Sequence, residues 1–315
     1  MRSSRTCRGL ALGLLVAALG ARAQTPAAVD GFNIERLYPS AAGAGWFVMD
    51  SLDWHGGLGG VLSFSARYAH DPLRVSGTPV VTDSAYGQIS GSVTWSFLRF
   101  SFGFDFPLAV KGQGPTLGGY RYPAADVDLG SFPDTLSDVR VGIDARLIGE
   151  WDGPFRLGLG AQLWIPSGET AQYLSDGTYR GMVRVLLAGD AGLLTYAGHV
   201  GVHIRPRDDG GVPGAPRGSE LLYGVAAGAK LFAAESSRAV IGPELYGATA
   251  FNGFFKPGTR STEALLSARW EETGTTGPQL RIKLGAGLGL GSQFGTASWR
   301  VMLGFEIYAT EPLRP

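Results

Sequence analysis

The sequence predicts an all-β fold: an antiparallel up-and-down transmembrane β-barrel of about twelve strands. Strict apolar–polar alternation recurs along the chain, as in residues 85–110, which read AYGQISGSVTWSFLRFSFGFDFPLAV. Glycine is abundant, with 49 residues, and no uninterrupted apolar stretch reaches the ~20 residues of a membrane helix. Short connections alternate with long ones between these stretches. Side chains of a strand point alternately to two faces, so each stretch has one apolar and one polar face.

The first 23 residues are predicted to be a secretory signal peptide. Arginines at positions 2, 5 and 8 precede an apolar run over 10–20, and Ala21-Arg22-Ala23 is a small-x-small cleavage pattern. The only cysteine, Cys7, lies in this segment. We therefore expect an exported protein of the Gram-negative envelope that folds without disulfides.

Residues 24–54 have no clear strand pattern, yet they are too apolar for a free tail. Their large apolar side chains are Phe32, Ile34, Leu37, Trp46, Phe47 and Met49. Two interpretations remain open. The segment enters the barrel as a partial plug, or residues 46–52 add an extra strand at its rim.

The barrel itself is predicted over residues 55–308, followed by a C-terminal tail at 309–315. The alternating rows lie at 58–68, 87–97, 100–106, 139–147, 155–165, 181–187, 194–204, 221–231, 241–247, 264–270, 280–290 and 299–307. Connections near residues 99, 152, 192 and 236 are short, and those at 71–84, 111–135, 166–177, 206–218 and 248–262 are long. Short turns at one end and long loops at the other are typical of outer-membrane barrels.

The polar face of the rows carries most of the charged residues. In a soluble sandwich this face would be solvated, but twelve strands with a signal peptide and no helices favour closure, with the apolar rows against lipid. We therefore predict that the lumen is lined, as a pore wall or an ion-pair network, by Arg67, Asp105, Asp138, Arg140, Asp144, Arg146, Arg156, Arg180, Arg184, Asp190, His199, His203, Arg205, Lys230, Glu244, Glu263, Arg269, Arg281, Lys283, Arg300 and Glu306.

Charge gives two alternatives for the lumen. The predicted lining has twelve basic and seven acidic residues, so an open lumen would prefer anions modestly. Alternatively, Arg140, Arg146 and Arg184 pair with Asp138, Asp144 and Asp190 in a closed network, which leaves a structural shell. Twelve strands lie between filled and open barrels, so size does not decide. Without the signal peptide the chain has 23 basic and 27 acidic residues, which gives no support to a nucleic-acid partner.

No motif points to catalysis, a cofactor or a metal. HExxH, GxSxG, P-loop and paired-cysteine patterns are absent from the sequence. The glycines of 285–291 repeat every second residue, as expected for a crowded lumen and not for a nucleotide loop. His199 and His203 share a strand face about 13 Å apart, too far to share a metal. Aromatic residues near row ends predict interfacial girdles, at Trp95, Phe97, Tyr179, Phe232, Trp270, Trp299 and Tyr308.

Several short motifs resemble the barrel portion of OmpA-family outer-membrane proteins of myxobacteria and their relatives. They are FNIERL at 32–37 with Pro39, 43–50, YAHDPL at 68–73, FPL at 106–108, DVRVG at 138–142 and LWIPSGE at 163–169. The resemblance runs from about Phe32 to Tyr308 and implies an outer-membrane barrel. Many relatives continue into acidic calcium-binding repeats and a peptidoglycan-binding domain. This chain ends at Pro315, so peptidoglycan tethering is not implied.

Together these observations predict a monomeric barrel in contact with outer-membrane lipid, acting as a passive pore for small solutes or ions or as a structural membrane protein. One alternative is a channel for small hydrophobic compounds, with an apolar lumen patch from Leu222, Met182, Leu265 and Met302. A membrane-embedded hydrolase is the other, and it would need a nucleophile and base that the sequence does not display.

Overall fold

The computed structural model describes residues 25–131, 135–234, 236–273, 277–291 and 293–310. The predicted signal peptide at 1–23 lies outside these residues, as does most of the predicted tail at 309–315. No helix among the described residues is long and apolar enough to cross a membrane.

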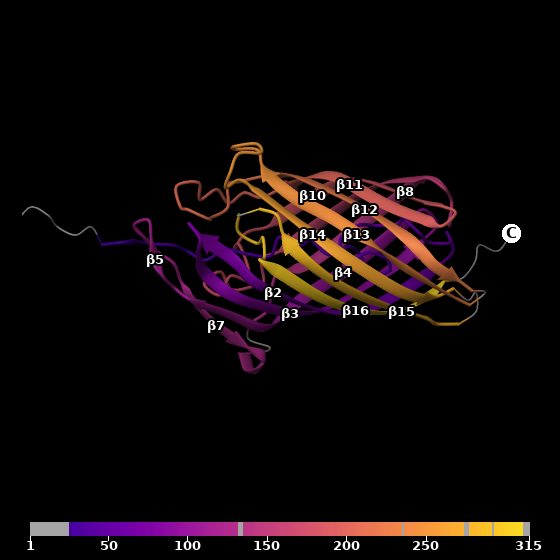
Figure 1. Cartoon of the computed structure of the whole chain (residues 1–315), viewed down its shortest axis with the longest axis horizontal. Coiled ribbons are helices and arrows are strands. Elements are labelled where there is room, and N and C mark those ends of the chain that lie inside the picture. Colours follow the sequence, from indigo (N-terminus) through magenta and orange to yellow (C-terminus); the bar gives the residue numbers. More distant parts are fainter. Residues whose placement is uncertain (1–24, 132–134, 235, 274–276, 292, 311–315) are drawn as a thin grey trace, which may run out of the picture.

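Twelve long strands of the described chain form one closed antiparallel sheet (Figure 1). Each strand pairs with the next along the chain, and the last pairs with the first. The prediction of a twelve-stranded barrel is therefore confirmed. The strands are β2 (Gly59–Val75), β3 (Thr78–Trp95), β4 (Leu98–Gln113), β8 (Val139–Ile148), β9 (Arg156–Ile165), β10 (Arg180–Ala191), β11 (Leu194–Ile204), β12 (Glu220–Ala233), β13 (Ser237–Ala250), β14 (Arg260–Glu272), β15 (Gln279–Gly289) and β16 (Trp299–Thr310).

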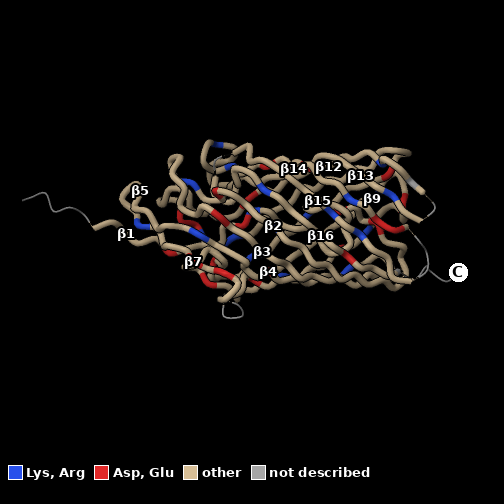
Figure 2. The backbone as a smooth tube through the Cα atoms, turned by 60° about the horizontal axis from the view of Figure 1, so that its bottom comes forward, with Lys and Arg blue, Asp and Glu red and all other residues tan. Residues whose placement is uncertain are grey.

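The two faces of the sheet differ as the alternation requires. On β15, Leu284 and Leu288 point outward and are 57% and 61% exposed, whereas Arg281 and Lys283 point inward and are buried. The same division holds on β2 between Leu62 and Arg67. Charged positions are scattered along the whole length of the barrel (Figure 2). Most of their side chains are buried inside it. An apolar outer face and a polar interior are what a lipid-embedded barrel needs.

The ends of the barrel are unequal. At the turn end, β3 joins β4 through residues 96–97, and β10 joins β11 through residues 192–193. At the loop end, the connections 166–179, 205–219, 251–259 and 290–298 are longer. The prediction of a long loop over 71–84 is wrong, since β2 and β3 continue to a tight turn at Ser76-Gly77. Pairing shifts register between His70 and Leu73, and Asp71 has a positive φ of 50°, which hid the alternation.

A compact apolar cluster covers the loop end. Between β4 and β8 the chain forms β5 (Thr116–Leu117), β6 (Tyr120–Arg121), β7 (Ala124–Asp128) and the 3-10 turn η1 (Leu129–Ser131), and β7 pairs with the end of β4. Strand β1 (Ala27–Ala28) pairs with β6. The buried cluster includes Phe32, Leu73, Val80, Tyr173 and Phe294, from segments far apart in the sequence. The long loops therefore fold onto one another over the barrel mouth.

Candidate functional site in the barrel lumen

The lumen is occupied by the chain's own N-terminal region, residues 29–54, which we call the inner segment. At the loop end it begins beside β1, which pairs with β6 (β1 is labelled in Figure 2). At the turn end the indole Nε1 of Trp54 donates a hydrogen bond to the carbonyl of Ser96, at 3.0 Å. Most side chains between these points are buried. The inner segment thus runs through the barrel from one end to the other.

Residues 46–52, for which a rim strand was one interpretation, belong to no strand and lie inside the barrel. They form a bend closed by a bridge between Gly45 and Asp50. Glu244 of β13 holds this bend. Its carboxylate accepts hydrogen bonds from the backbone nitrogens of Phe47, Val48 and Met49, at 3.0, 2.9 and 3.3 Å. A buried carboxylate that accepts three backbone donors is a strong fixed point for an irregular segment.

Arginines of the barrel wall bind the carbonyl groups of the inner segment. Arg140 donates to the carbonyls of Pro39 and Ser40. Arg156 Nε donates to Ser51 at 2.9 Å, and Arg146 Nη1 donates to Leu52 at 3.2 Å and to Trp54 at 2.6 Å. The few backbone hydrogen bonds within the inner segment do not involve these carbonyl groups, so the carbonyl groups need such side-chain partners inside the barrel.

Glycines on the inward face make room for the large side chains of the inner segment. A Cβ added at Gly285 would lie 2.8 Å from the ring of Phe47, and one at Gly228 would lie 2.7 Å from the ring of Trp46. The apolar side chains of this bend pack with Ala226, Val240, Leu265 and Met302 of the wall. The abundant glycine of the strands is thus partly explained by what the barrel encloses.

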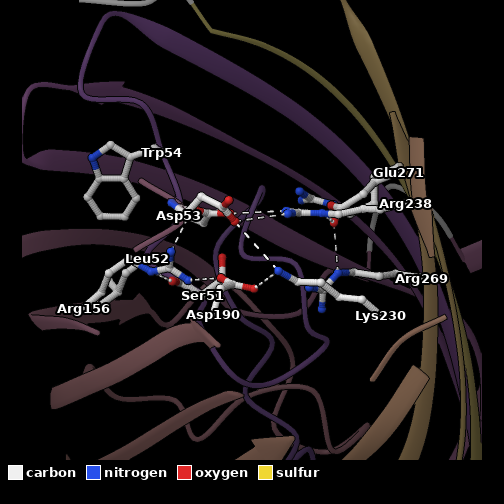
Figure 3. A network of polar contacts seen from close by, with 12 residues as sticks. Ser51, Leu52, Asp53, Trp54, Arg156, Asp190, Lys230, Arg238, Arg269 and Glu271 are labelled. Carbon is white, nitrogen blue, oxygen red and sulfur yellow. Dashed lines mark hydrogen bonds and ion pairs between the residues drawn. The ribbon is translucent and has the colours of Figure 1, made fainter. Parts of the chain in front are cut away.

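An ion-pair network closes the lumen near the turn end (Figure 3). Asp53 of the inner segment pairs with Arg156 at 3.1 Å and with Arg238 at 3.4 Å. Asp190 pairs with Arg156 at 2.6 Å and with Lys230 at 2.9 Å. These side chains come from β9, β10, β12 and β13, so the network ties the inner segment to four strands of the wall.

Further ion pairs continue along the lumen. Also close to the turn end, Arg99 contacts both Asp50 and Asp144. Toward the loop end, Glu35 pairs with Arg67 at 3.0 Å and with Arg300 at 3.2 Å. In each group one acidic residue comes from the inner segment and the basic residue from a strand. The segment therefore supplies counter-charges to the wall.

Comparison with solved structures agrees with the barrel fold. No family model matches the sequence, and no curated protein matches it. Among solved structures, an outer-membrane channel from Pseudomonas putida F1 is similar, with a TM-score of 0.51 at 13% identity, covering 80% of this chain and 95% of that one. The chain folds as an outer-membrane β-barrel.

Two further solved structures also match. The NanC porin has a TM-score of 0.45 at 11% identity, covering 79% of this chain and 99% of that one. The β-domain of the Bordetella autotransporter BrkA has a TM-score of 0.41 at 14% identity, covering 80% and 98%.

The structure places all 21 residues predicted to line the lumen on the inward side of the barrel. Most are buried, and Asp105, Arg146, His199 and Lys230 are half-buried. The pairing among them differs from the predicted one. Arg140 and Arg146 bind carbonyl groups, and Arg184 lies 3.8 Å from Asp144 instead of pairing with Asp190. Asp138 pairs with Arg180 at 2.8 Å. The predicted pairs were neighbours in sequence, whereas the observed partners come from other strands or from the inner segment.

Two other predictions about side chains need correction. Tyr308 was expected in an outer aromatic girdle, but it follows Ile307 in the alternation and points inward, where Arg281 lies 4.9 Å from its ring. The four apolar residues considered for a hydrophobic path do face inward, but they are covered. Leu265 and Met302 pack on the bend of the inner segment, and Met182 and Leu222 pack with Tyr38.

The two histidines on β11 have different surroundings. His203 is fully buried, with its Nδ1 3.0 Å from the hydroxyl of Tyr38 and 3.4 Å from Glu220. His199 lies farther along the strand, near Arg184 and Met49. Among the described residues, no group of three or more His, Cys, Asp or Glu side chains is placed to hold a metal ion.

Sequence reasoning missed nine charged residues of the lumen. Those on strands or at their ends are Arg99, Glu220, Arg238 and Glu271, all in phase with the inward face. The alternation would have identified them if the strands had been extended by a few residues. The others are Glu35, Arg36, Asp50 and Asp53 of the inner segment and Asp176 of the β9–β10 loop, for which no periodic signal exists.

These additions change the charge of the lumen. With them, the described lumen residues comprise fifteen basic and thirteen acidic side chains, so the expected excess of five positive charges falls to two. Space is also limited. A cavity of about 270 Å³ lies at the turn end, and the next cavities found among the described residues hold only about 20 and 10 Å³. A volume of 10 to 20 Å³ holds about one water molecule.

Proposed function

We propose that this protein is a channel of the Gram-negative outer membrane whose lumen is closed at rest by its own inner segment. The observation that carries the proposal is the clamp of Glu244 on the backbone of residues 47–49, in the middle of a lumen filled by side chains. A passive, permanently open pore has no use for such a clamp. The proposal includes export through a cleaved signal peptide and a turn end that faces the periplasm, as in other outer-membrane barrels.

Opening requires many contacts to break together. Each hydrogen bond to a charged group contributes roughly 1.5–3 kcal/mol net. Glu244, Arg140, Arg146 and Arg156 all make such bonds to the inner segment. Spontaneous release of the whole segment is therefore rare, and shorter local displacements at either end are the easier route.

An opened lumen would prefer anions only weakly. The basic excess among the described lumen residues is two charges, and Arg36 leaves with the inner segment together with Glu35, Asp50 and Asp53. Removal of one positive and three negative charges raises the excess of the wall. Anion preference should therefore increase as the segment withdraws.

Single-channel recording of the refolded protein in a planar bilayer under a salt gradient tests the proposal. The native protein should be silent or show rare, brief openings, and Glu244→Gln should open more often because an amide accepts fewer backbone donors. The matched control is Glu169→Gln, a change at an exposed loop residue. Steady conductance of the native protein would contradict the closed resting state. Silence of the folded Glu244→Gln protein, with the segment shown to be released, would contradict the channel and leave a structural shell.

A further inference from the structure

The cavity of about 270 Å³ at the turn end has no role in the clamp on the inner segment. It is bounded by Trp54 at the end of the inner segment and His55 directly after it, by the β8–β9 turn at Trp151 and Asp152, and by strand ends around Gln279 and Arg281. Trp151 is 45% exposed, so solvent reaches this part of the wall. An apolar cavity of ~150 Å³ suffices for a benzene molecule. The turn-end cavity is therefore large enough for a substituted aromatic ring.

Aromatic surfaces form much of its wall. The imidazole of His55 stacks on the indole of Trp151, with ring centroids 4.1 Å apart and planes inclined by 23°. Trp54 lies under the guanidinium of Arg99, at 5.0 Å, and Tyr308 under that of Arg281, at 4.9 Å. Flat rings of this kind favour a flat apolar ligand, since offset-stacked and edge-to-face contacts add to the gain from burial.

The hydrogen-bonding groups of the cavity are unbalanced in favour of donors. Arg99 uses Nε and Nη2 for Asp50 and Asp144, and no described residue accepts a hydrogen bond from its Nη1. Arg281 uses Nε and Nη1 for Glu271 and Glu306, and its Nη2 likewise has no acceptor among the described residues. The side-chain amide of Gln279 makes no hydrogen bond within this same set of residues.

The acidic residues of the cavity, Asp53, Asp152 and Glu272, already face donors or cations, and the carboxylate of Asp152 lies 3.6 Å from Arg238 and 3.9 Å from Lys230. Both carboxylate oxygens of Asp53 are used, Oδ1 by Arg156 and by the backbone of Asp152, and Oδ2 by Arg238. Glu272 accepts a hydrogen bond from the backbone of Leu280 at 2.9 Å. Unused donors beside acidic groups that already face donors or cations favour a ligand that brings acceptor oxygens. A carboxylate suits them best, because the unused N–H groups of the two arginines would form charge-assisted hydrogen bonds with it.

We propose that the turn-end cavity binds small aromatic carboxylates, with the ring packed against the stacked side chains of His55 and Trp151 and the carboxylate toward Arg99, Gln279 and Arg281. The proposal goes beyond channel function, because it requires binding at one end of the barrel and no conduction. Trp54 belongs to the inner segment, so an occupied cavity contacts the segment where it leaves the lumen.

Isothermal titration of the refolded full-length protein in detergent with benzoate tests this site. Benzoate should bind, and benzyl alcohol and benzylammonium should bind at least about tenfold more weakly, because they lack the charged acceptor. Trp151→Ala and Gln279→Leu should each weaken benzoate binding by about tenfold. The matched control is Trp95→Ala, which removes an outward-facing indole that is 64% exposed and lies away from the cavity.

Several results would overturn the assignment. Absence of benzoate binding at millimolar concentrations would remove the site. If benzyl alcohol binds as tightly as benzoate, the site does not recognise the carboxylate. If cyclohexanecarboxylate binds as tightly as benzoate, the site does not recognise the aromatic ring. Unchanged affinity in both folded variants would place binding elsewhere, such as the detergent belt. Heat-modifiable gel mobility shows whether each variant is folded, and Gln279→Leu tests the cavity even if Trp151→Ala fails to fold. A silent channel in planar bilayers leaves this binding test unaffected.

Discussion

The carboxylate of Glu244 accepts a hydrogen bond from the backbone nitrogen of Val48 at 2.9 Å, and the exposed fraction of each residue is 2% or less. One residue belongs to the barrel wall and the other to the inner segment, 196 positions apart. This bond and its two neighbours fix the bend of the inner segment against β13. The stability of the barrel and the closure of its lumen are therefore coupled through one side chain.

Replacement of Glu244 by glutamine should lower the free energy of unfolding by roughly 1.5–3 kcal/mol, because the amide nitrogen accepts no hydrogen bond and leaves one or two of the three backbone donors without an acceptor. Urea titration monitored by tryptophan fluorescence would measure the change. Glu169→Gln, at an exposed position, should leave the midpoint unchanged. Equal midpoints for the two variants would contradict the clamp.

Replacement of Gly285 by valine should destabilise the protein by roughly 1–3 kcal/mol, since the new side chain would overlap the ring of Phe47, which lies 2.8 Å from the added Cβ. Phe47→Ala in the same chain should recover part of this loss. A double-mutant cycle from urea midpoints measures the coupling. Strict additivity of the two changes would show that Phe47 does not occupy the lumen beside β15.

Replacement of Leu284 by arginine should cost about 2–4 kcal/mol of folding free energy in lipid, because this residue is 57% exposed on the outer face of β15. The same change at Leu280, near the turn end of β15, should cost only about 0–1 kcal/mol because the interface lies closer. Refolding yields into vesicles, read by gel mobility, would compare them. Equal penalties at the two depths would contradict the lipid-facing assignment.

The stability contribution of Asp176 should depend on pH. Burial alone would raise the pKa of this loop carboxyl, but Arg205 and Arg180, with hydrogen bonds from Arg205 and the backbone of Asn33, hold the pKa well below its usual range. A lowered folded-state pKa means that the contribution is complete above the unfolded value of about 3.9 and is lost as pH falls toward the folded value.

Asp176→Asn should therefore destabilise the loop end by roughly 3–5 kcal/mol at pH 7, since it leaves Arg205 without its buried partner. The difference between variant and native protein should shrink progressively below about pH 4. Urea midpoints measured from pH 7 down to pH 3 would follow it. A difference that is constant over this range would contradict the ion pair.

The barrel was readable from the sequence because lipid and lumen impose opposite demands on alternate residues. Leu284 beside Lys283 is enough to assign both faces of β15. The alternation also explains the error at Tyr308. Its aromatic ring suggested a membrane girdle, but on β16 the even-numbered residues point inward. Where alternation was broken, as at Asp71, the strand continued without a readable signal.

For the inner segment, the sequence predicted only that its apolar side chains are buried somewhere in the protein. Its hydrogen bonds join residues such as Val48 and Glu244, which lie 196 positions apart, and no periodic pattern in the sequence predicts such a contact. Several lumen arginines bind this segment and others bind distant strands, so their pairing was not predictable either. Arg140 lies two residues from Asp138, yet it binds the carbonyl groups of Pro39 and Ser40.

The route of the inner segment also has a consequence for assembly. It runs from β1 among the loops to Trp54 at the turn end, and β2 begins only five residues later, at Gly59. A segment enclosed on all sides has to be captured before the β2–β16 seam closes, or threaded afterwards through a filled tube. We expect capture first, so that the sheet closes around the inner segment. An epitope fused at residue 25 should then appear at the cell exterior, and one fused after residue 310 on the opposite side of the membrane.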